Sequence, residues 1–73
     1  MKTYEEFREY LKRNGISLKE DEERIIAGLN YIEISKTEEH RILFSIVLVE
    51  DIKELELIKK AIELAETPLS ERA

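Results

Sequence analysis

The sequence predicts a small α+β domain in which an antiparallel β-hairpin is covered by helices and completed by dimerisation. The chain has 73 residues, the length of one domain. Helical periodicity lies towards both ends, and between them residues 42–49 contain one polar residue, Ser45. A short run rich in β-branched side chains is typical of a strand. This strand is apolar on both faces, so it requires cover on both sides.

The first helix is predicted from Tyr4 to Asn14. Thr3 and Glu6 have the spacing of a capping box, in which each side chain accepts a hydrogen bond from the backbone of the other residue. Gly15 follows the last helical residue and is the residue type that most readily adopts the left-handed conformation there. Apolar and aromatic residues recur on one face of this helix.

The next segment allows two interpretations. Ser17 and Glu20 repeat the capping-box spacing and predict a second helix from Leu18 to about Ala27, ended by Gly28. We favour this interpretation. The alternative starts a strand near Ile25 and assigns Gly28 to a bulge or a close backbone approach. The predicted order of elements is therefore α-α-β-β-α or, alternatively, α-β-β-α.

The hairpin is predicted from two strand patterns, Asn30–Ser35 and Ile42–Val49, joined by a short polar connection. We expect Ser35 to face His40. That register pairs residue 32 with residue 43 and residue 31 with residue 44, which brings two aromatic side chains together. A slip of one residue would reverse every face of the strand.

The last helix is predicted from Asp51, which with Glu54 forms a third capping box, to about Glu66. Pro68 ends it, and residues 67–73 are expected to be a flexible tail outside a single domain at 1–66. Apolar residues cover about half of the circumference of this helix or more, whereas a surface helix needs a narrower stripe. The helix can therefore cover its own sheet and still offer apolar surface to a partner.

Self-association is the expected source of additional stability. A core of this size rarely supplies more than about 3–5 kcal/mol without disulfides, a metal or a partner subunit. The chain has no cysteine and one histidine, His40. We therefore expect a homodimer, and the candidate interface residues are Leu57, Ala61, Leu64, Leu43, Val47 and Val49.

The composition restricts the function. Charged residues make up 40% of the chain and the net charge is −5, which disfavours a dedicated nucleic-acid binder. No apolar run is long enough to cross a membrane, and the first residues do not form a signal peptide, so we expect a cytoplasmic protein. Abundant Glu, Lys and Ile with no Gln or Cys resemble thermophilic usage.

No cluster of residues indicates catalysis, so we expect neither enzymatic activity nor a cofactor or metal. His40 is expected to be a solvated turn residue, and the acidic run at 20–23 a solvated face. The predicted function is a small acidic protein-interaction module, an adaptor, regulator or inhibitor, that acts as a homodimer on an unidentified protein partner. The alternative is a DNA-binding transcriptional regulator with a helix-turn-helix-like N-terminal half. In that alternative, the acidic run would face the phosphates.

Overall fold

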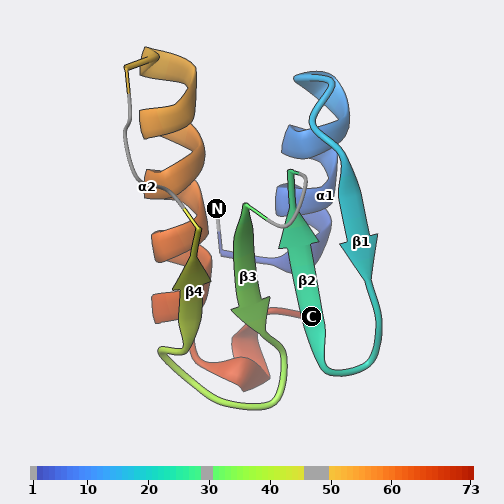
Figure 1. Ribbon diagram of the computed structural model, residues 1–73. Coiled ribbons are helices and arrows are strands. Elements are labelled where there is room, and N and C mark those ends of the chain that lie inside the picture. The colour runs from blue at the N-terminus through green and yellow to red at the C-terminus, as the bar shows by residue number, and fades with distance from the viewer. Residues whose placement is uncertain (1, 29–30, 46–49) are drawn as a thin grey trace.

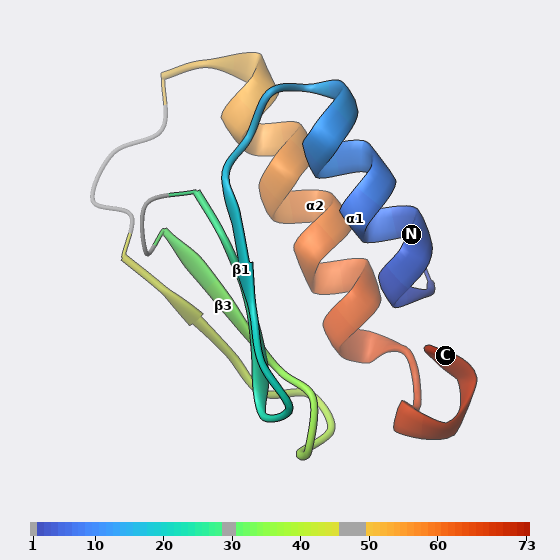
Figure 2. The ribbon, with the colours of Figure 1, turned by 90° about the vertical axis from the view of Figure 1, so that its right-hand side faces the viewer.

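Two helices lie side by side on one face of a four-stranded antiparallel sheet in the computed structural model, which describes residues 2–28, 31–45 and 50–73 (Figures 1 and 2). The elements are α1 (Tyr4–Arg13), β1 (Leu18–Glu20), β2 (Arg24–Ala27), β3 (Ile32–Ser35), β4 (Ile42–Phe44), α2 (Ile52–Glu66) and the 3₁₀ turn η1 (Leu69–Glu71). The strands lie in chain order, so β1 and β4 form the two edges. The predicted α+β class is confirmed.

The first helix forms as predicted because both of its ends are capped. Thr3 and Glu6 make the reciprocal capping box. At the other end, Gly15 has a φ of +64°, and the Ile16 N–H donates to the carbonyl of Leu11 at 2.9 Å. The Gly15 N–H donates to the carbonyl of residue 12, which completes a Schellman motif.

The predicted second helix from Leu18 to Ala27 is wrong, because these residues form the β1–β2 hairpin. Asp21 makes the turn: its carboxylate accepts from the backbone N–H groups of residues 23 and 24, at 2.8 and 3.0 Å. The strands place Ile25 and Ala27 on the buried face by simple alternation. Acidic residues 20–23 therefore surround a turn, and Ser17 caps no helix.

The hairpin between β3 and β4 forms, but its predicted register is wrong by one residue. Ile34 pairs with Ile42, and Ile32 pairs with Phe44. This register places Ile42 and Phe44 on the face that the helices cover, and it leaves Leu43 on the open face. Packing Ile42 against the core beside Ile34 outweighs the aromatic pair that we expected. Residues 46–49 of the predicted strand lie outside the described residues.

The core lies between the sheet and the two helices. Its buried apolar residues come from α1, β2, β3 and α2, and they are Phe7, Tyr10, Leu11, Ile25, Ala27, Ile32, Ile34, Leu57, Ala61, Leu64 and Ala65. α2 begins after Asp51, whose carboxylate accepts from the N–H of Lys53 at 2.9 Å, and ends at Glu66 as predicted.

The C-terminal segment packs against the domain, in contrast to the flexible tail that we expected. Arg72 is fully buried and has the largest of the fully buried side chains in the described part of the chain. Its guanidinium donates to the carbonyls of Thr67 at 2.7 Å, Ala65 at 2.9 Å and Ser35 at 2.8 Å. The backbone N–H of Tyr4 donates to the Arg72 carbonyl at 2.8 Å. One residue thus joins the start of α1, the end of β3 and the end of α2.

Replacing Arg72 should destabilise the domain strongly. Arg72→Met leaves three buried carbonyls without their charged donor, so we expect the free energy of unfolding to fall by about 3–5 kcal/mol. Urea denaturation followed by circular dichroism measures the loss. The control is Arg41→Met, whose side chain is 61% exposed and whose replacement should cost at most about 0.5 kcal/mol. Equal losses in the two variants would contradict the role of Arg72.

Gly28 should tolerate a side chain less well than Gly15. Both residues have positive φ, +73° and +64°, so alanine costs about 1–2 kcal/mol of backbone strain at either position. A Cβ at Gly28 would also lie 2.8 Å from the Cβ of Tyr31, whereas nothing lies within 4 Å of one at Gly15. We expect Gly28→Ala to cost about 1–3 kcal/mol more than Gly15→Ala in urea denaturation. Equal costs would show that the close approach contributes nothing.

Candidate functional site

Three of the candidate interface residues lie in the core of the domain itself. Leu57, Ala61 and Leu64 are at most 4% exposed, so they are not available at the surface, in contrast to our expectation. The reason is the wider sheet: four strands and α1 occupy the face of α2 that a single hairpin would have left open. Leu43 is exposed on the open face of the sheet, whereas Val47 and Val49 lie outside the described residues.

Other apolar side chains are exposed in their place. They are Leu18, Leu43, Phe44, Ile52, Leu55 and Ile62, with exposed fractions between 38% and 72%. The sequence pattern includes residues 55 and 62 of α2 in the broad apolar arc but does not assign them to the surface. Because Leu55 and Ile62 are seven residues apart, the sequence does indicate that they share one side of the helix, next to Ile58.

Leu55 and Ile62 lie on the side of α2 that faces away from α1. The ammonium of Lys60 lies 5.1 Å from the centre of the Tyr10 ring, which locates Lys60 on the α1 side of α2. Ile62 is rotated by about 200° from Lys60, nearly opposite to it on the helix. α2 lies along the β4 side of the sheet (Figure 1), and Phe44 points to the helix-covered face from β4. We call Phe44, Leu55 and Ile62 the apolar flank.

The two edges of the sheet differ in chemistry. β1 carries Lys19 and Glu20, and the Glu20 side chain points to the helix-covered face, where an inward charge discourages pairing with another strand. β4 consists of Ile42, Leu43 and Phe44 and has no charge. It contains neither the proline nor the lysine that commonly protects an edge.

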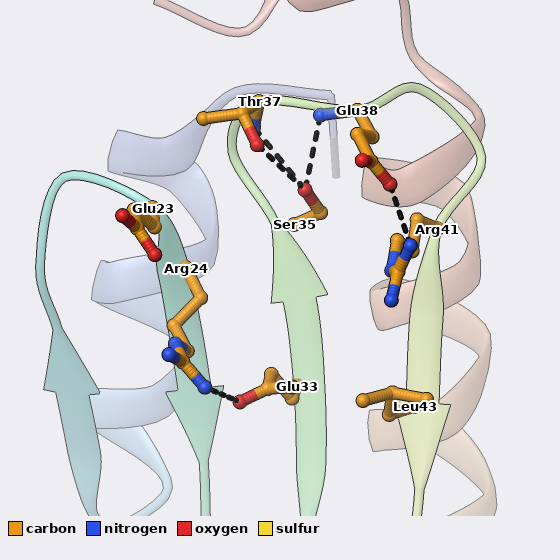
Figure 3. A pocket seen from close by; sticks show the side chains of 8 residues that line it. All are labelled: Glu23, Arg24, Glu33, Ser35, Thr37, Glu38, Arg41 and Leu43. Carbon is orange, nitrogen blue, oxygen red and sulfur yellow. Dashed lines mark hydrogen bonds and ion pairs between the residues drawn. The ribbon is translucent and has the colours of Figure 1, made fainter.

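The open face of the sheet is hollowed and carries charges of both signs (Figure 3). One hollow of about 240 Å³ is lined by Glu23, Arg24, Glu33, Ser35, Thr37, Glu38, Arg41 and Leu43. A second hollow of about 240 Å³ shares Glu33 and Leu43 with the first and adds Ile26 and Ser45. Ile26 and Leu43 are therefore the apolar part of a largely polar face.

Four of the charged side chains of this face form two ion pairs. Arg24 on β2 and Glu33 on β3 point toward each other and form an ion pair of 2.8 Å. Arg41 and Glu38 form another of 2.8 Å beside the turn. The hydroxyl oxygen of Ser35 accepts from the N–H groups of residues 37 and 38, so the turn is held by short polar contacts.

Glu20 connects the helix layer to the sheet. Arg8 Nε donates to Glu20 Oε1 at 2.7 Å, and the ammonium of Lys36 lies 2.6 Å from Glu20 Oε2. The Arg8 hydrogen bond is the main cause that lowers the pKa of Glu20 from 4.5 to about 2; burial opposes this shift, and Lys36 adds to it. Arg8, Lys36 and Arg72 also surround the Tyr4 ring at 5.3–5.9 Å. These contacts connect α1, β1, the β3–β4 turn and the C-terminal segment.

The remaining candidate groups do not assemble into a site. His40 is exposed in the turn between β3 and β4, as expected, and its backbone N–H donates to the carbonyl of Ala65. Within residues 2–28, 31–45 and 50–73, no three His, Cys, Asp or Glu side chains are grouped as metal ligands. The helix-turn-helix alternative loses its second helix to the β1–β2 hairpin.

Comparisons of the chain with protein-family models, with curated proteins and with solved structures find no match. In the part of the chain that the structure describes, neither helix combines the length and the apolar composition needed to cross a bilayer.

Glu20→Gln should lower stability at neutral pH and change its dependence on pH. The native pKa of about 2 lies below the ordinary 4.5, so the carboxylate stabilises the fold fully above about pH 4.5. This contribution is lost as the pH falls from about 4.5 through about 2. Since the Arg8 side chain is 42% exposed, we expect a moderate loss of about 2 kcal/mol at pH 7.

Urea denaturation of wild type and Glu20→Gln between pH 2 and pH 7 measures this difference. The two stability curves should converge near pH 2, where Glu20 becomes protonated in the folded wild type. Glu22→Gln, in an exposed residue of the same acidic run, should follow wild type throughout. A Glu20→Gln curve that stays parallel to wild type down to pH 2 would refute the ion-pair assignment.

Proposed function

We propose that this protein is a protein-interaction module that acts as a homodimer. The observation that supports the proposal is the apolar flank. Phe44, Leu55 and Ile62 are 42%, 47% and 38% exposed although the core beside them is complete. Exposed apolar patches of several hundred Å² commonly mark interaction sites.

The energy available at the flank favours association. Burying a large aliphatic or aromatic side chain contributes about 1.5–3 kcal/mol when burial is complete. Each flank residue has already lost about half of its exposure, so a partner would gain about half of this value per side chain. Three side chains on each of two subunits then contribute about 4.5–9 kcal/mol. A micromolar dimer needs about 8 kcal/mol beyond the entropy cost of association, so contacts outside the flank must supply the rest.

The open face of the sheet is the second surface in this proposal. It carries Ile26 and Leu43 among paired charges, the mixture found at the polar, reversible interfaces of regulatory proteins. The net charge of −5 accelerates encounters with basic partners and slows those with acidic ones. The flank would thus join two copies, and the open face would remain for another protein, which the dimer regulates, inhibits or brings to a second partner.

Sedimentation equilibrium of the wild type tests the homodimer. At micromolar concentration we expect a mass of twice 8.6 kDa. Leu55→Glu and Ile62→Glu place a charge in the flank and should each raise the dissociation constant at least about tenfold, which corresponds to 1.4 kcal/mol. Both positions are exposed, so circular dichroism should show folded chains.

The matched control is Leu18→Glu, which introduces the same charge at a similarly exposed leucine on the opposite edge of the sheet and should leave the dimer intact. Wild type that sediments at 8.6 kDa throughout the micromolar range would rule out the homodimer. Partner binding is tested separately with Arg24→Glu on the open face, in capture from the native host. If this variant captures the same proteins as wild type, the open face is not the second surface.

A further inference from the structure

We propose that two copies of this chain join through antiparallel pairing of β4 with β4, so that the two sheets become one continuous sheet. The inference rests on the proposed homodimer and specifies its geometry. The occupant of the β4 edge is a second copy of the chain, related by a two-fold axis through Leu43.

The backbone of β4 presents pairing positions on its outer side. The Ser35 N–H donates to the carbonyl of Arg41, and the Ser45 N–H donates to the carbonyl of Tyr31. The backbone groups of residues 41, 43 and 45 therefore point toward β3. Those of Ile42 and Phe44 alternate with them and point away from the sheet. In the described part of the chain no strand lies on that side of β4.

Antiparallel pairing about Leu43 is self-complementary. Ile42 of one copy would form the hydrogen-bonded pair with Phe44 of the other, and both outward-pointing residues of each strand would be satisfied. The Leu43 side chains, each 53% exposed in the single chain, would meet across the axis on the open face. On the other face, Phe44 would lie opposite Ile42. Every cross-strand contact of β4 would thus be apolar.

The helix layer fits the same arrangement. Because α2 lies along the β4 side of the sheet, joining two β4 edges brings the two α2 helices together over the seam (Figure 1). Leu55 and Ile62 face away from α1, which is the direction of the second copy. A single two-fold rotation would therefore both cover the apolar flank and pair the β4 edge. An isolated peptide added to β4 would leave Leu55 and Ile62 without a helix to contact.

The exposed surface of the chain is larger than expected for a monomer of its mass, whereas its net charge opposes self-association. The chain exposes 5156 Å², whereas a monomer of this mass is expected to expose about 4,700 Å². This excess is a property of the whole surface of the chain; for comparison, each partner buries roughly 800 Å² in a standard interface. β4 has no charged residue, but each copy carries a net charge of −5. Salt screens the repulsion between copies, so the dimer should tighten as salt increases.

Cross-linking through Leu43→Cys tests the geometry. Directly opposed residues of a non-hydrogen-bonded antiparallel pair have Cα atoms about 4.5 Å apart, within the range of a disulfide, which starts at about 4.4 Å. The chain contains no other cysteine, so any disulfide must join two copies at this position. With a mild oxidant at micromolar concentration, we expect most of the chain to migrate at twice 8.6 kDa on a non-reducing gel.

Leu18→Cys is the control, because Leu18 is 40% exposed on the opposite edge and can meet another copy only by collision. Its cross-linking should be at least about tenfold slower. As a second variant, Leu43→Lys should weaken the wild-type dimer at least about tenfold, since lysine protects an edge strand against pairing. Leu43 is exposed, so both variants should remain folded by circular dichroism.

The failures of the two proposals can be distinguished. If wild type is a dimer but Leu43→Cys cross-links no faster than Leu18→Cys, the β4 geometry is overturned and the proposed homodimer stands. The geometry is also overturned if Leu43→Lys dimerises as tightly as wild type. If wild type is a monomer in sedimentation, the β4 dimer and the proposed homodimer fail together, and the edge would be left for an extended segment of another protein.

Discussion

The fold depends on the guanidinium of Arg72, which closes the end of the domain where four elements meet. The helices cover the sheet on one face, so no further layer on the open face helps to hold the core together. Arg72 compensates by donating to the carbonyls of Ser35, Ala65 and Thr67, while its own carbonyl accepts from Tyr4. Its positive charge also lies at the C-terminus of α2, where the helix dipole is negative and the last turn has no basic residue. The ion pairs of Glu20 with Arg8 and Lys36 connect the layers at the same end.

A sheet with one covered face determines where function can reside. The helices cover the inner faces of β2 and β3. Of the sheet, the open face and the β4 side are therefore left for partners. The open face is polar and its charges are paired, which favours reversible contacts. The β4 side has an uncharged edge strand and the apolar flank, which favour a permanent contact. In the proposed function, the β4 side joins two copies of the chain and the open face binds another protein.

Local signals in the sequence were sufficient for the two helices, because Thr3, Gly15 and Asp51 act on residues within one turn. They failed for residues 18–27, where Ser17 and Glu20 have capping-box spacing but Asp21 forms a turn instead. The alternative interpretation was closer to the structure, since Ile25 lies in a strand. The close contact of Gly28 is with the Tyr31 side chain, however, and the strand ends before it, at Ala27. The register of β4 and the buried side of α2 depend on how many strands the sheet has, which is a tertiary property. Arg72 could not be located in advance, because its acceptors are backbone carbonyls, which leave no signal in the sequence, and one of them, that of Ser35, lies 37 residues away.

Amide hydrogen exchange of Tyr4 in the full chain, followed by NMR, tests the closure by Arg72 most directly. The first amide of a helix has no partner within the helix and normally exchanges fast. Here the Tyr4 N–H donates to the carbonyl of Arg72 at 2.8 Å, so we predict protection comparable to that of Ile25 in the core. Exchange of Tyr4 at the rate of an exposed amide, with Ile25 still protected, would show that the C-terminal segment is free of the domain and would contradict the closure by Arg72.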